Sequence, residues 1–171
     1  MHLKIMELIT HNLVAVIIQI LCFRYFAFPL AIIFTIIFAY ISHLVVDGFA
    51  KITYHTPDAH TNDKFWVVWH IIIYSVSLIS LIVFIVPFWL AILFANLIDI
   101  TDWFILRPIR KRRLNKQAEV NQQNLWYAHE QVDWIRNKLL FWLPDWTHKY
   151  TGVLIEIIII ISLSLLIFFI I

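Results

Sequence analysis

The stretch PLAIIFTIIFAYISHLVVDG, residues 29–48, decides the fold class. A run of this length matches the roughly 20 helical residues that cross about 30 Å of hydrocarbon. Near its end it carries His43 and Asp47, which are four residues apart and therefore share one face of a helix. The stretch predicts a membrane-spanning helix with a polar pair close to one end.

The whole chain has the same apolar character. Of its 171 residues 62% are hydrophobic, and the mean hydropathy is +0.84, whereas soluble domains are roughly 45 to 50% apolar. The dominance of Ile, Leu, Phe and Trp favours helices over the alternating strands of an outer-membrane barrel. The single Cys22 excludes an internal disulfide or a cysteine-rich metal site. We expect an all-α, polytopic membrane helix bundle.

About five transmembrane helices are expected, at 5–23, 29–48, 65–84, 87–106 and 152–171. Pro87 suits the first turn of a helix, so a tight turn should separate the third and fourth spans near residues 85–87. The chain then divides into a four-helix transmembrane region (1–106), a basic amphipathic segment (107–150) and a C-terminal transmembrane helix (151–171). We expect the first span to be retained, because no cleavage motif follows it.

Lysine and arginine predict the orientation. Nine of the 13 basic residues lie in 107–150, which places that segment and the amino terminus in the cytoplasm and the carboxyl terminus outside. An apolar and aromatic face suited to the membrane surface comprises Leu125, Trp126, Val132, Trp134, Ile135, Leu139, Leu140, Phe141 and Trp142, with Pro144 ending the helix. Membrane lipids are the expected partners. Nucleic acid is not, because the basic run at 110–113 is short, adjacent to the membrane and explained by topology.

Ionisable side chains within the predicted spans lie at one level. Such groups cost on the order of 2.5 to 3.5 kcal/mol each and usually mark function. With about 1.5 Å of rise per residue, one layer near the cytoplasmic ends holds His11, His43, His70, Asp99, Asp102 and Glu156. We expect these side chains to meet in a shared site. The alternative is that each lies near an interface merely for solvation.

Two further polar segments could extend this layer. A second H-x-x-x-D, formed by His129 and Asp133, shares a helical face with Arg136 and would cap the layer from the cytoplasmic side. His55 and His60, in the loop after the second span, would supply further ligands. The alternative for both is a solvated surface.

Imidazole and carboxylate ligands together suit a divalent Zn, Mn or Fe ion. The candidate metal ligands are His11, His43, Asp47, His70, Asp99, Asp102, His129 and Asp133. Asp99 and Asp102 are also the candidate catalytic residues, because a carboxylate beside a metal can serve as general base. Such a site would hydrolyse esters or phosphoesters. Its depth near the headgroups favours a lipid or lipid-linked substrate.

These motifs resemble the membrane-bound metal-dependent hydrolases. The shared elements are Thr10-His11 in the first span, the S-H-x-x-x-D of Ser42, His43 and Asp47, and an aspartate pair at Asp99 and Asp102. In this chain the aspartate pair follows the S-H-x-x-x-D, whereas in the family it precedes it. The resemblance implies a hydrolase with a metal site built from these positions.

Three other functions fit parts of the pattern. His11, His43 and His70 on three helices would suit a haem-binding bundle, although clustered aspartates disfavour a haem pocket. Chained Asp, Glu and His are also expected in a proton or cation pathway. A structural membrane protein would pair its charges internally, for example Asp99 with Arg107 or Asp133 with Arg136.

Overall fold

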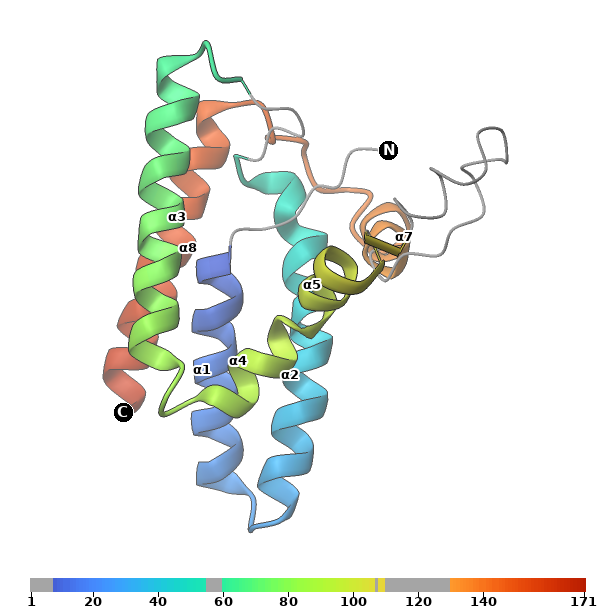
Figure 1. Ribbon diagram of the computed structural model, residues 1–171, viewed down its shortest axis with the longest axis vertical. Coiled ribbons are helices and arrows are strands. Elements are labelled where there is room, and N and C mark those ends of the chain that lie inside the picture. Colours follow the sequence, from blue (N-terminus) through green and yellow to red (C-terminus); the bar gives the residue numbers. More distant parts are fainter. Residues whose placement is uncertain (1–7, 55–59, 107, 110–129) are drawn as a thin grey trace.

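The computed structural model describes residues 8–54, 60–106, 108–109 and 130–171, and this described part contains helices and connecting turns but no strand (Figure 1). The long helices are α1 (Leu8–Tyr25), α2 (Leu30–Phe49), α3 (Lys64–Phe84) and α8 (Tyr150–Ile170). Each is long and apolar enough to cross a membrane, α2 together with the short 3₁₀ helix η1 (Ala50–Ile52). The predicted all-α polytopic membrane bundle is confirmed.

The fourth expected span is broken. Residues 87–106 do not form one helix but α4 (Trp89–Ala95), α5 (Leu97–Ile100) and the π-helix η2 (Thr101–Leu106), with a bend of 55° at the break. The break falls at Asn96, whose side-chain Nδ2 donates to the carbonyl of Ile92 at 2.8 Å. Asparagine side chains compete in this way with the regular helical hydrogen bonds. The bundle has five spans if α4 and the bent continuation 97–106 are counted together as one.

Helix α1 lies at the centre of the bundle, in contact with α2, α3, α4 and α8 (Figure 1). Small residues allow the close approach of α1, α2 and α4, because Ala15, Ala39, Ala91 and Ala95 are all fully buried in one cluster. Helices in lipid associate by close packing rather than by the hydrophobic effect, and small residues at their contacts favour it. This packing brings the start of α1 and the ends of α2 and α4 together.

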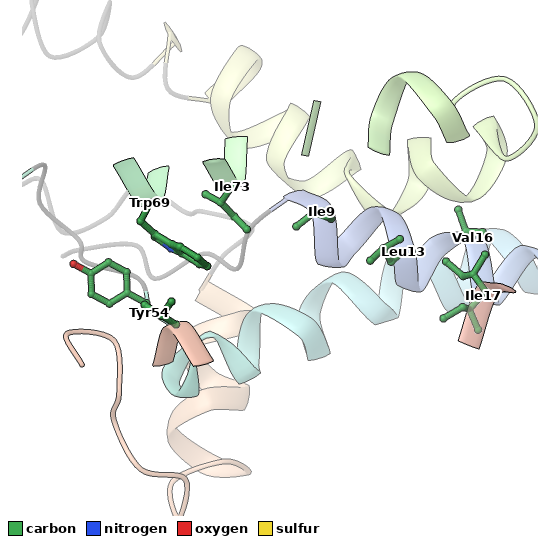
Figure 2. Close-up of a cluster of buried hydrophobic side chains, with 9 residues drawn as sticks. Ile9, Leu13, Val16, Ile17, Tyr54, Trp69 and Ile73 are labelled. Carbon is green, nitrogen blue, oxygen red and sulfur yellow. The ribbon is translucent and has the colours of Figure 1, made fainter. Parts of the chain in front are cut away.

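A second cluster of buried side chains fills the space between α1, α3 and α8 (Figure 2). Ile9, Leu13, Val16 and Ile17 lie on one face of α1, as their spacing requires. Figure 2 shows Trp69 of α3 close to Tyr54, which follows η1, and Ile73 further along α3. The cluster fixes α3 and α8 against the face of α1 that carries these residues.

Helix α7 (Glu130–Lys138) packs on the carboxyl end of α2. Gly48 makes the contact close, because a Cβ there would lie 3.0 Å from Leu140 and 3.2 Å from Ile135. Trp134 and Trp142, in contrast, are exposed. The single apolar face expected for this segment is therefore divided. Ile135 and Leu140 pack on α2 at Gly48, whereas Leu139 and these aromatic residues are exposed.

The chain after α7 returns to the same end of α2. The backbone N–H of Trp146 donates to the carbonyl of Lys51 at 2.8 Å. Gly152, at the start of α8, approaches this junction so closely that a Cβ would lie 2.6 Å from the Trp146 carbonyl and 2.7 Å from the Tyr54 nitrogen. Only glycine fits there without a backbone shift, so this residue sets the position of α8.

Candidate metal centre

His11, His43 and Asp47 converge where α1 begins and α2 ends. Because the two helices are antiparallel neighbours, the first turn of α1 lies beside the last turns of α2. His11 Nε2 lies 3.0 Å from Asp47 Oδ1, and His43 Nε2 lies 3.3 Å from Asp47 Oδ2. The three side chains are buried, and one ligand atom from each lies within 4.8 Å of the other two. No other group of this kind is found among the described residues.

The tautomer of His43 follows from its hydrogen bond to the break between α4 and α5. His43 Nδ1 lies 2.6 Å from the carbonyl oxygen of Ala95, the last residue of α4. A carbonyl only accepts, so Nδ1 carries the proton and donates it. When the ring is neutral, Nε2 then presents a lone pair towards Asp47. Such a backbone acceptor is the usual outer partner of a metal-binding histidine.

Lone pairs therefore meet at one point of the site. His43 Nε2 faces Asp47 Oδ2 at 3.3 Å and Asp99 Oδ1, on α5, at 3.9 Å. An imidazole lone pair and two carboxylates repel one another unless a positive charge lies between them. A proton held at this point, a neighbouring cation or a bound metal ion would relieve that repulsion.

The spacing of these atoms fits a first-row metal ion. Ligand atoms about 2.1 Å from a tetrahedral zinc lie about 3.4 Å apart. The two imidazole–carboxylate distances are 3.0 and 3.3 Å, to different oxygens of Asp47, and the three candidate ligand atoms all lie within 4.8 Å of one another. Two imidazoles make the group unlike the all-oxygen sites of calcium or magnesium. The chain thus holds a buried His-His-Asp group that could bind a metal ion.

The ring stack rules out one of the ligand pairs that the haem interpretation allows. The rings of His11 and His43 are stacked, with centroids 4.3 Å apart and an interplanar angle of 23°. Two imidazoles in direct contact leave no room for a porphyrin between them. In this arrangement His11 and His43 cannot ligate a haem from opposite faces.

Arg136 connects α7 to the same end of α2. Its Nη2 donates to the backbone carbonyl of Asp47 at 2.9 Å, and the side chain is buried. A guanidinium at a helix carboxyl end is favourable because the last carbonyls carry partial negative charge. Arg136 therefore places a positive charge beside the residue whose carboxylate joins the two histidines.

His70 lies apart from this group. Its Nδ1 lies 2.7 Å from the Trp66 carbonyl, its ring stacks on Trp66 with centroids 4.0 Å apart, and Tyr54 and Tyr74 are its other aromatic neighbours. Tyr54 follows the end of α2, so α3 places His70 beyond the level of His43. The common level expected from span boundaries does not extend to this residue.

The other candidates divide into described and undescribed residues. Asp99 lies beside the centre, while Asp102 on η2 and Glu156 on α8 are fully buried but outside the three-residue group. His60 is exposed in the turn before α3. His55 and His129 lie outside the described residues, as does the side chain of Asp133.

Two groups that belong to the surroundings of the metal centre were not expected from the sequence. The Ala95 carbonyl has no sequence signal, since any residue carries one. Asn12 follows His11 directly, and its fully buried amide accepts a hydrogen bond from Asn96 at 3.1 Å. The sequence signal for Asn12 was its position: an asparagine directly after a candidate ligand, within an apolar span.

No family model matches the chain, and no curated protein or solved structure matches it either. The chemistry of the centre is therefore the basis for assigning a function.

Proposed function

We propose that this protein is a membrane-embedded, metal-dependent hydrolase acting on a lipid or lipid-linked ester or phosphoester. The observation that supports this most strongly is the buried convergence of His11, His43 and Asp47 with Asp99 at its edge. Two histidines and one carboxylate form a ligand set of catalytic zinc sites, which keep a further position open. Mononuclear iron sites use the same set, so Fe is a candidate besides Zn, as is Mn.

Each residue has a separate part in this proposal. His11, His43 and Asp47 bind the ion, and the Ala95 carbonyl orients His43. A bound ion of this kind supplies a Lewis acid and a nucleophilic water at neutral pH. Asp99, 3.9 Å from His43 Nε2 and partly exposed, accepts the proton of the attacking water as general base. The fully buried Asp102 was the other expected catalytic residue and lies one turn further along, in η2.

The location of the centre supports a lipid substrate. It lies near the end of a membrane-spanning helix, on which α7 packs, and exposed aromatic residues are present in α7 (Trp134) and just after it (Trp142). Aromatic side chains favour the headgroup level of a bilayer. With the orientation expected from the basic residues, the substrate's scissile bond would be reached from the cytoplasmic leaflet.

The proposal is tested by hydrolysis with purified protein in lipid vesicles. Release of phosphate and fatty acid would be measured from phosphatidic acid and phosphatidylglycerol, along with cleavage of nitrophenyl phosphate, phosphodiester and acyl ester probes. We expect activity that a chelator removes and added metal restores. Asp99→Asn should lower the rate by about 10²- to 10⁴-fold with the metal content unchanged. Asp63→Asn is the matched control, because Asp63 caps α3 by accepting from Phe65 N–H, a bond that asparagine also makes.

Either of two results would contradict the proposal. One is metal-loaded protein that cleaves none of these substrates. The other is Asp99→Asn protein that retains the full rate.

A further inference from the structure

The break in the α4–α5 span exposes backbone groups that a membrane cannot solvate. Within hydrocarbon every such group needs a partner inside the protein. The Ile92 carbonyl accepts from the backbone N–H of Asn96 at 3.1 Å and from its Nδ2 at 2.8 Å. The Ala95 carbonyl accepts from His43. The break therefore provides the acceptor that fixes the tautomer of His43.

Asn96 is held in turn by α1. Its Nδ2 also donates to Asn12 Oδ1 at 3.1 Å, so the bonds to Ile92 and Asn12 use both of its amide protons. Asn12 Nδ2 donates to Ser80 Oγ of α3 at 3.0 Å. All three side chains are more than nine-tenths buried. One buried polar network thus joins the residue after His11 to the residue after Ala95.

A regular helix through this point would remove the Ala95 carbonyl from His43. In a continuous helix the carbonyl of residue 95 accepts from the backbone N–H of residue 99. It would then point along the helix axis towards that N–H rather than towards His43 Nδ1. Asn96 opposes that continuation because its side chain is anchored on Asn12 of α1, while it also donates to the Ile92 carbonyl of its own helix.

We infer that Asn12 and Asn96 are positioning residues of the metal centre: together they hold the helix break open, keep the Ala95 carbonyl on His43 Nδ1, and so aim His43 Nε2 at the ion. Neither residue binds the ion or the substrate. The inference rests on the proposed function for the identity of the ligand, but the tautomer of His43 is independent of it. Outer partners of this kind usually change metal affinity by about 10- to 100-fold.

The test combines imidazole ¹⁵N chemical shifts with zinc affinity in detergent-purified protein labelled at histidine. The His43 signals are assigned by their loss in His43→Gln. In metal-free wild type, at an alkaline pH where the ring is neutral, we expect a single His43 tautomer with the proton on Nδ1. In Asn96→Ala and Asn12→Ala we expect a mixture of tautomers, and zinc affinity lower by about 10- to 100-fold.

Thr35→Val is the matched control. Thr35 is also fully buried on α2, but its hydroxyl donates only to Ala31, one turn away. It should leave both the His43 signals and the zinc affinity unchanged. Each variant is first checked for a monodisperse elution profile, and either asparagine variant alone suffices for the comparison.

Three outcomes are separable. A wild-type His43 with its proton on Nε2 overturns the inference without any variant. Unchanged His43 signals and zinc affinity in a monodisperse asparagine variant also overturn it. Wild type that binds no metal contradicts the proposed function, whereas a tautomer shift in Asn96→Ala would still support the role of the two asparagines.

Discussion

Oδ1 of Asp47 lies 3.0 Å from His11 Nε2, so a carboxylate near the end of α2 contacts an imidazole from the first turn of α1. The other oxygen of the same carboxylate lies 3.3 Å from His43 Nε2. Asp47 thus joins the two histidines, and Arg136 holds its backbone carbonyl. Loss of this one carboxylate should disturb the centre more than loss of any neighbouring polar group.

His70 should be dispensable for metal binding. It lies in an aromatic cluster with Trp66, Tyr54 and Tyr74, apart from the three-residue group. His70→Phe keeps a ring in that cluster and should leave the metal content of purified protein unchanged. If elemental analysis shows that His70→Phe protein has lost its metal, His70 is a ligand after all.

Arg136→Ala should loosen α7 from the bundle. The variant removes a buried, charge-assisted hydrogen bond to Asp47, and such bonds contribute about 1.5 to 3 kcal/mol. We expect a lower unfolding temperature in detergent and faster hydrogen exchange in 130–138. Lys138→Ala, two residues along and exposed, is the control and should change stability by less than about 0.5 kcal/mol. Equal effects of the two substitutions would show that the Arg136 contact contributes nothing specific.

The two glycines should respond differently to alanine. At Gly152 a Cβ would lie 2.6 to 2.7 Å from backbone atoms, which cannot move aside, whereas at Gly48 it would meet only the side-chain ends of Leu140 and Ile135. We expect Gly152→Ala to cost about 1 to 3 kcal/mol. Gly48→Ala should cost less, because alanine favours a helix over glycine by roughly 0.5 to 1 kcal/mol. Thermal unfolding compares them, and the reverse order would contradict the close packing at Gly152.

Tyr54 should make stability depend on pH in the alkaline range. Burial, then the charge of Asp63 and the nearby Tyr150, raises the pKa of the Tyr54 phenol above its ordinary value. The folded state therefore holds this proton more tightly than the unfolded chain does. The contribution of this proton to the stability of the fold is complete below the unfolded pKa of about 10. It is lost as pH rises through the folded pKa.

We therefore expect wild type to lose more stability above about pH 10 than Tyr54→Phe does. Thermal unfolding at stepped pH measures the difference. Tyr25→Phe is the control, because Tyr25 is largely exposed, and it should follow wild type. Parallel curves for wild type and Tyr54→Phe would contradict the effect of burial on Tyr54.

The sequence predicted the membrane class and the pairing of His43 with Asp47, because both follow from periodicity and hydropathy. His11 also lies at the centre, as its place near the start of the first span indicated. His70 does not, because equal distance from a helix end is equal depth only when the helices start at one level. Tyr54 lies beyond the end of α2 and is a neighbour of His70. The end of α3 that carries His70 therefore does not lie at the same level as the end of α2.

The break at Asn96 could not be predicted for a related reason. The sequence 87–106 is apolar enough for a continuous helix, and a single asparagine is often tolerated in one. What favours the break is the amide of Asn12 on α1, 84 residues away in the chain. The hydrogen bond from His43 to Ala95 depends on that tertiary contact, so it has no local signal.

The most direct test of the metal centre is the metal content of detergent-purified protein from metal-replete cells, measured by elemental analysis. We predict at least one equivalent of Zn, Mn or Fe per chain in wild type and in Thr35→Val. We predict none in Asp47→Asn or His43→Gln, although both remain monodisperse. Metal-free wild type, or metal retained in both centre variants, would contradict the assignment of His11, His43 and Asp47 as a metal site.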